Sequence, residues 1–158
     1  MVIQGHSFSF QHTQENVGGK STFYLQMKTG STEIALVSYS GAVSGGDWSF
    51  RLWEEPDIAD GSNSINIYNA KRNSAALSEI VFFSNPVIND IEVGEKIKCA
   101  IVGGEQKRMA GFLPHEDRVD ILLPNSDYVW AFENKDNSAH NVCFRCSWIE
   151  FALRGGNA

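Results

Sequence analysis

Long apolar runs and positive charges are both scarce in this chain of 158 residues. The longest apolar runs, such as 80–83, have the length of a strand, whereas a membrane-spanning helix needs about 18 apolar residues. Lys and Arg total 13 against 19 Asp and Glu, so the formal net charge is −6. Because binding to phosphates depends on clustered Lys and Arg, this balance argues against a phosphate-bound partner. We expect neither a membrane nor a nucleic acid as a direct partner.

Cysteine is also scarce, and its odd count of 3 suits a reducing compartment better than a disulfide framework. The spacing of Cys143 and Cys146 would fit half of a zinc site or a redox pair. A zinc ribbon needs a second pair, however, and Cys99 stands alone. The neighbouring residues alternate as in a strand, which places positions 143 and 146 on opposite faces. The sequence therefore predicts two buried or half-buried thiols, with no zinc and no disulfide between them.

Helical periodicity is missing as well, apart from one turn around 71–77. Instead, turn residues recur at short intervals between runs of period-two alternation, a pattern typical of an antiparallel sandwich or barrel. We predict an all-β chain of about ten strands, with little or no helix, folded as a single β-sandwich domain over 1–158 with short frayed ends. The segments with strand patterning are 6–10, 32–39, 47–52, 64–68, 78–83, 96–102, 118–123 and 128–132.

Catalytic motifs are missing too. The segment 42–46 is one residue short of a Gly-x-Ser-x-Gly elbow and precedes a strand rather than a helix. The segment 102–105 lacks the Lys-Ser/Thr ending of a phosphate loop. His6 and His12 share a strand face with two phenylalanines, which is more typical of core or edge histidines than of metal ligands. The sequence therefore predicts no enzyme, no metal site and no cofactor.

The longest stretch without strand character is 103–116. Long loops on a rigid sheet scaffold often form interaction surfaces. Met and Arg are enriched in interface cores, and an aromatic anchor commonly contributes much of the binding energy. The candidate partner-binding residues in this loop are Lys107, Arg108, Met109 and Phe112. Two alternatives stay open: the loop is an ordinary surface loop, or its two apolar side chains plug the end of their own sandwich.

Tryptophan supplies one further candidate. Trp48 and Trp130 lie on the apolar faces of alternating strands, so we expect both in the core. Trp53 lies on the face opposite Trp48 and is predicted to be exposed or interfacial. Farther along, Arg72, Asn73 and Ser74 offer polar groups that can bridge backbone atoms. We expect these three residues to fix a long connection that crosses between the sheets.

Markers of strands and turns run nearly from end to end of the chain. They are the opening strand 6–10, the strand-to-turn step 50–56, the Asn-rich segment 69–74, the turn 123–128 and the ending 146–151 with its aromatic-x-Glu. Together they resemble a family of small virion proteins of tailed bacteriophages, which act as capsid decoration or cement subunits. The segment 103–116 matches no part of that pattern.

The resemblance implies a jelly-roll sandwich on the exterior of the virion capsid, made in the host cytoplasm. Its partner would be the major capsid protein, bound by non-catalytic contacts that stabilise the shell. Such a subunit is expected to form a homotrimer, or alternatively a dimer. A second hypothesis is a carbohydrate- or host-binding module of a phage tail or head fibre, because sandwiches rich in aromatic residues commonly bind sugars by ring stacking. For that module, Trp53 would be the exposed ring.

Overall fold

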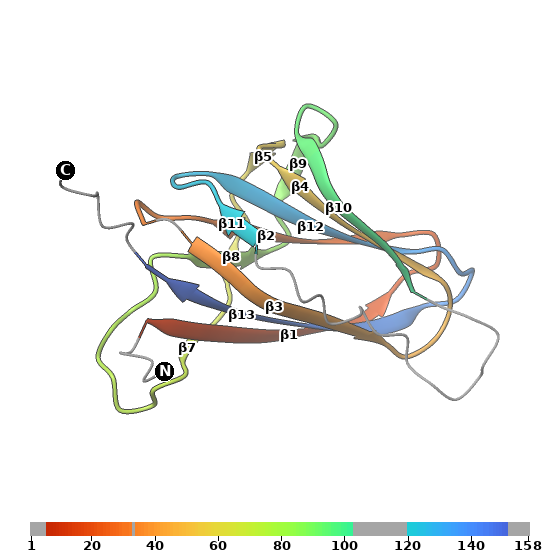
Figure 1. Ribbon diagram of the computed structural model, residues 1–158. Coiled ribbons are helices and arrows are strands. Elements are labelled where there is room, and N and C mark those ends of the chain that lie inside the picture. Colours follow the sequence, from red (N-terminus) through yellow and green to blue (C-terminus); the bar gives the residue numbers. More distant parts are fainter. Residues whose placement is uncertain (1–5, 33, 103–119, 152–158) are drawn as a thin grey trace.

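The computed structural model describes residues 6–32, 34–102 and 120–151, which form thirteen strands and no helix (Figure 1). This confirms the predicted all-β class. The longer strands are β1 (Ser7–Val17), β2 (Thr22–Lys28), β3 (Ile34–Val43), β4 (Trp48–Glu54), β8 (Val81–Ser84), β10 (Glu95–Val102), β12 (Asp127–Asn134) and β13 (His140–Glu150). The shorter ones are β5 (Asp57–Ala59), β6 (Asn63–Ser64), β7 (Tyr68–Asn69), β9 (Val87–Asp90) and β11 (Asp120–Leu122). The described part of the chain holds no helix that could cross a membrane.

Two large antiparallel sheets pack face to face as a sandwich. One has the order β11-β3-β13-β1-β7, the other has the order β10-β4-β12-β2-β8-β6, and β5 pairs with β9 in a small third sheet. Successive strands β1 to β4 alternate between the two large sheets. The order β1-β13-β3-β11 facing β2-β12-β4-β10 is compatible with the jelly-roll arrangement, in which paired strands are distant in sequence.

The core lies between the two sheets and is mainly aromatic. Trp48, Phe50 and Leu52 all have an exposed fraction of 0%, which confirms the predicted inward face of β4. The rings of Phe132 and Phe144, from opposite sheets, meet edge to face with centroids 5.1 Å apart. The other large, fully buried side chains include Trp130, Trp148, Tyr128, Phe8, Phe10 and Phe82. This aromatic layer joins the two sheets into one hydrophobic core.

The chain crosses between the sheets after β6. The sequence pattern predicts one strand over 64–68, but the structure has strand only at its two ends, in β6 and β7. The reason is that β6 pairs with β8 of one sheet whereas β7 pairs with β1 of the other. The intervening residues bridge the gap, and the amide of Ile65 still donates to the carbonyl of Phe82 over 2.8 Å. The turn expected around 71–77 is irregular rather than helical.

The two nearby cysteines lie as the alternation predicts. Cys146 is buried in the core, whereas Cys143 is half-buried on the other face of β13. Cys99 is exposed on β10, and all three thiols are free. The expectation of two thiols on opposite faces of one strand is therefore confirmed.

Candidate functional site

Within the described ranges, no group of three or more His, Cys, Asp or Glu side chains could hold a metal ion. His6 is exposed, and the ring of His12 stacks on Phe23 with centroids 5.5 Å apart. The Nε2 atom of His12 is buried and makes no hydrogen bond within the described part of the chain. Exposed apolar side chains are the more distinctive surface features of the described residues.

Nine large apolar side chains are exposed in the described part of the chain, and they gather at three places. Four lie on or beside the edge strands β10 and β11: Ile97, Ile101, Ile121 and Leu123. Three line a cavity next to β7 and β8: Tyr68, Leu77 and Val81. The other two, Val87 and Val93, lie on β9 and on the turn that follows it. Clusters of this kind mark interaction surfaces more often than scattered single residues do.

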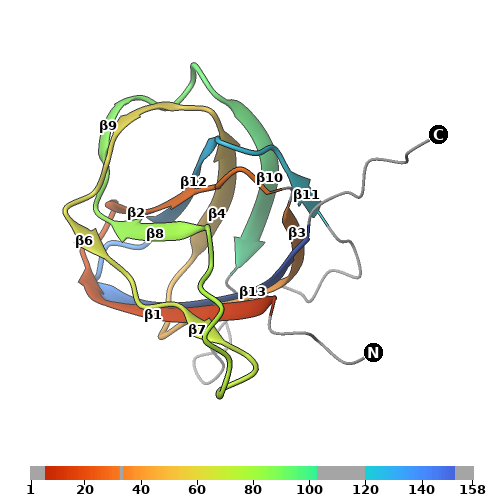
Figure 2. The ribbon, with the colours of Figure 1, turned by 90° about the vertical axis from the view of Figure 1, so that its left-hand side faces the viewer.

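The first cluster forms what we call the β10–β11 edge. β10 ends one sheet and β11 ends the other, and both lie on the same side of the sandwich (Figure 2). The ammonium of Lys98 in β10 lies 2.5 Å from the carboxylate of Asp120 in β11. The same ammonium donates a hydrogen bond of 2.5 Å to the hydroxyl of Tyr39 and lies over its ring. This largely buried contact holds the two edge strands together on their inner side.

The outer side of the same edge is apolar. Ile101 is 79% exposed and Ile121 is 65% exposed. Among the described residues, no strand pairs with the free side of β10, so its backbone groups remain available there. An edge strand with exposed aliphatic side chains can bind a partner through both backbone hydrogen bonds and apolar contact.

Trp53 lies next to this edge, on the outer face of β4. It is partly exposed, whereas Trp48 on the inner face is buried, so the predicted outward orientation of Trp53 is confirmed. Trp53 is paired directly with Lys96 of β10, whose ammonium lies 5.9 Å from the centroid of the indole ring. Such an exposed cation–π contact contributes about 0.5–1 kcal/mol and keeps the ring in place at the surface.

The remaining predicted partner-binding residues are Lys107, Arg108, Met109 and Phe112, and they lie outside the described residues. Their segment connects β10 to β11 in sequence. The described residues on either side of it are Val102, where β10 ends, and Asp120, where β11 begins. The sequence does not predict that the isoleucines of β10 and β11 are exposed, because a short apolar run is typical of a buried strand. Their exposure follows only from the position of β10 and β11 at the edges of their sheets.

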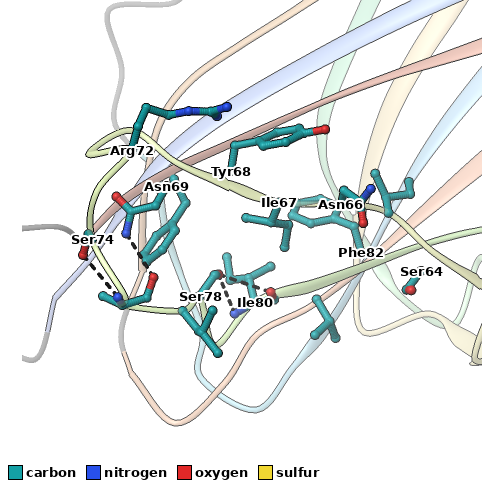
Figure 3. A pocket seen from close by; sticks show the side chains of 15 residues that line it. Ser64, Asn66, Ile67, Tyr68, Asn69, Arg72, Ser74, Ser78, Ile80 and Phe82 are labelled. Carbon is teal, nitrogen blue, oxygen red and sulfur yellow. Dashed lines mark hydrogen bonds between the residues drawn. The ribbon is translucent and has the colours of Figure 1, made fainter.

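The second cluster surrounds a cavity of about 520 Å³ between the crossing connection and β8. Its floor is apolar and includes the buried side chains of Phe8, Ile80 and Phe82. Figure 3 shows Tyr68 and Arg72 along one side of this cavity and Ile80 along the other. A volume of this size is typical of ligand and anchor-residue pockets. No sequence motif predicts this cavity, because its floor and its rim come from three separate segments.

The predicted bridging residues lie on the rim of this cavity. The guanidinium carbon of Arg72 lies 5.2 Å from the centroid of the Tyr68 ring. The hydroxyl of Ser74 accepts a hydrogen bond from the amide of Ala76 over 3.2 Å. Asn69 adds a bond that the prediction missed, from its side-chain amide to the carbonyl of Ala76 over 3.0 Å. These contacts hold the connection between β7 and β8 in place within its own segment. Asn73 is exposed in the same connection.

Neither a protein-family model nor a curated protein matches the chain.

Proposed function

We propose that this protein is a non-enzymatic structural subunit that binds the outer surface of a bacteriophage head through the major capsid protein and strengthens the shell. The observation that carries this proposal is the β10–β11 edge. Four exposed aliphatic side chains there lie on or beside two adjoining strands that a partly buried ion pair holds together. Exposed aliphatic side chains on a rigid edge are stabilised when a protein partner covers them.

Strand addition gives this edge a physical route to a shell protein. The free side of β10 offers backbone donors and acceptors, and the exposed side chains of Ile101 in β10 and Ile121 in β11 offer apolar contact. Each contact can be weak, because a shell presents the same site many times and linked contacts multiply through effective concentration. A net charge of −6 suits an exterior position, where the partner is protein rather than packaged nucleic acid.

The sequence markers support the same proposal through their structural roles. The step 50–56 carries the chain from β4 to the turn before β5, and the ending 146–151 is the last half of β13. These markers therefore belong to the scaffold that presents the edge. The markers support the resemblance to the decoration family because they belong to the fold. The β10–β11 edge is the surface that would contact the capsid protein.

Co-sedimentation with heads tests the proposal. Heads assembled from the major capsid protein of the same genome are mixed with wild-type protein, with Ile101→Lys and with Ile121→Lys, and then pelleted. We expect each lysine variant to bind at least tenfold more weakly, because the charge would be desolvated at an apolar contact. Val87→Lys is the matched control, since Val87 is also exposed (58%) but lies on β9. Wild-type protein that fails to pellet, or edge variants that pellet like the control, would reject this function.

A second candidate function is sugar binding, and one observation favours it: Tyr68 is 48% exposed at the mouth of the 520 Å³ cavity. Three of the four tryptophans are buried and cannot stack on a sugar, so the candidate rings among the described residues are the partly exposed Trp53 and the exposed Tyr68. A glycan array with wild-type protein and Tyr68→Ala decides the matter. Strong, selective binding that is lost in the variant would replace the structural role with this one.

A further inference from the structure

The turn between β9 and β10 carries an exposed apolar side chain at its tip. Val93 is 68% exposed, and the turn projects from the body of the molecule (Figure 1). The carboxylate of Asp90 accepts a hydrogen bond from the amide of Glu92 over 3.0 Å, and the amide of Gly94 donates to the carbonyl of Ile91 over 3.1 Å. The turn is therefore held in one shape by its own hydrogen bonds, and it needs little ordering when it binds.

Acidic side chains surround this valine, and some of them face one another. Glu54 lies directly opposite Glu95 in the β4–β10 ladder, and Asp57 lies directly opposite Asp90 in the β5–β9 ladder. Like charges in directly opposed cross-strand positions destabilise a sheet. A cationic partner surface would relieve both repulsions. The fold thus presents an apolar tip on a turn whose flanking strands carry two cross-strand pairs of acidic residues.

The cavity beside β7 and β8 has the complementary character. Its floor is apolar, and the segment that forms its rim, 61–78, contains no acidic residue but two basic ones, Lys71 and Arg72. Both side chains are exposed. Arg72 is held beside the opening by its contact with the ring of Tyr68. Tyrosine and arginine around an apolar pocket are the residue types that most often dominate protein–protein binding energy.

The turn and the cavity lie at opposite ends of the molecule. Figure 2 shows the β9–β10 turn at the top and the connection after β7 at the bottom, and Figure 1 shows the same separation. One copy therefore cannot fill its own cavity with its own turn. A second copy can, because each molecule carries one of each surface.

We infer that Val93 of one copy enters the cavity of a second copy, with Glu92 placed against Arg72 at the rim. The contact is head to tail, so it joins two different surfaces and closes into a ring when the rotation between subunits allows it. A ring of three would match the homotrimer that the family resemblance implies. This inference goes beyond the proposed function, because the contact forms between copies in solution without any shell.

Exchanging the charges at positions 92 and 72 tests this contact. The mass of the protein in solution is measured by sedimentation equilibrium for wild type, Glu92→Arg, Arg72→Glu and the double variant. We expect the wild type to associate and each single variant to associate at least tenfold more weakly. The double variant should recover association, because the same pair of charges is present in exchanged positions. Mixing the two single variants should recover association only between unlike variants, so pairs and alternating chains form but a closed ring of three does not.

Further measurements exclude unfolding and non-specific charge effects. Glu15→Arg, on an exposed site of β1, is the matched control and should leave association unchanged. Circular dichroism and thermal unfolding should be alike for all variants. A wild type that stays monomeric at all concentrations, or single variants that associate normally, would overturn the inference. Head binding through the β10–β11 edge is measured separately. Ile101→Lys should still associate in solution although it no longer pellets with heads, and that result would support a contact between copies that is independent of the shell.

Discussion

Glu150, the last residue of β13, accepts a hydrogen bond of 3.0 Å from the backbone amide of Glu79. The same carboxylate accepts bonds from the amide of Ile80 over 3.3 Å, from the indole of Trp148 over 3.1 Å, and from the hydroxyl of Ser78. It is only 7% exposed. One buried carboxylate thus joins the end of one sheet to the segment that enters β8 of the other sheet. This gives a structural reason for the aromatic-x-Glu ending of the chain.

The first prediction concerns this carboxylate. Glu150→Gln should lower the free energy of unfolding by about 2 kcal/mol, because the partners of the carboxylate are all donors and an amide presents a competing donor. Chemical denaturation with urea measures the change. Glu15→Gln on the exposed side of β1 is the control and should alter stability by less than about 0.5 kcal/mol. Equal effects of the two substitutions would show that the buried hydrogen bonds do not contribute.

A second prediction compares two buried tryptophans. Trp148 donates its indole N–H to Glu150, whereas the indole N–H of Trp130 is buried and finds no hydrogen-bond partner among the described residues. Phenylalanine in place of either residue removes similar apolar volume. Trp148→Phe should therefore be more destabilising than Trp130→Phe by about 1–3 kcal/mol, since it alone removes a hydrogen bond to a charged group. Paired urea denaturation curves measure the difference, and a larger loss for Trp130→Phe would contradict this account.

The sequence predicted the fold class because period-two alternation directly reports which side chains face the core. Trp48, Phe50 and Leu52 show this, since all three alternate with polar residues and all three are buried. Which strands pair with one another does not follow from any such pattern in the sequence. Gln26 is fully buried, and its side-chain amide donates a hydrogen bond of 2.8 Å to the carboxylate of Asp60, 34 residues later. Contacts between distant segments of this kind decide which strands become neighbours.

The candidate surfaces were predicted less completely than the fold. The outward position of Trp53 followed from alternation with Trp48. The exposure of Ile101 did not, because an apolar residue in a strand is expected inside unless that strand ends the sheet. The cavity near Arg72 is not predicted by the sequence, although residues on its rim are predicted to bridge backbone groups. Its apolar floor comes from β1 and β8, which sequence alone does not bring together.

Thiol labelling gives a third prediction. Burial raises the pKa of the Cys146 thiol, and the thiolate is the reactive form. In the native protein, Cys99 should react first, Cys143 more slowly, and Cys146 only after unfolding. Mass spectrometry of a labelling time course measures the order. No loss of two hydrogens should appear on the peptide that holds Cys143 and Cys146, because their side chains lie on opposite faces of β13.

Acid stability gives a fourth prediction. Hydrogen bonds from Lys28 and then from Gln26 hold the pKa of Asp60 below its usual value. A depressed folded-state pKa adds stability above the unfolded-state pKa, and this stability is lost as the pH falls through the folded-state value. The difference in melting temperature between wild type and Asp60→Asn should therefore be largest near neutral pH and shrink below about pH 4. A difference that is constant with pH would contradict the assignment.

The last prediction concerns the segment that connects β10 to β11. It follows β10 and precedes β11 in sequence, and both strands carry an exposed isoleucine, so we expect side chains within it to enlarge the surface that Ile101 provides. Replacing Lys107, Arg108 and Phe112 together by alanine should leave thermal unfolding unchanged but weaken head binding at least tenfold, because an aromatic anchor and its basic neighbours commonly supply much of an interface's binding energy. Co-sedimentation with heads measures binding, and Lys135→Ala, an exposed lysine in another turn, serves as the control. A triple variant that melts earlier yet decorates heads normally would instead assign Phe112 to the packing of its own sandwich.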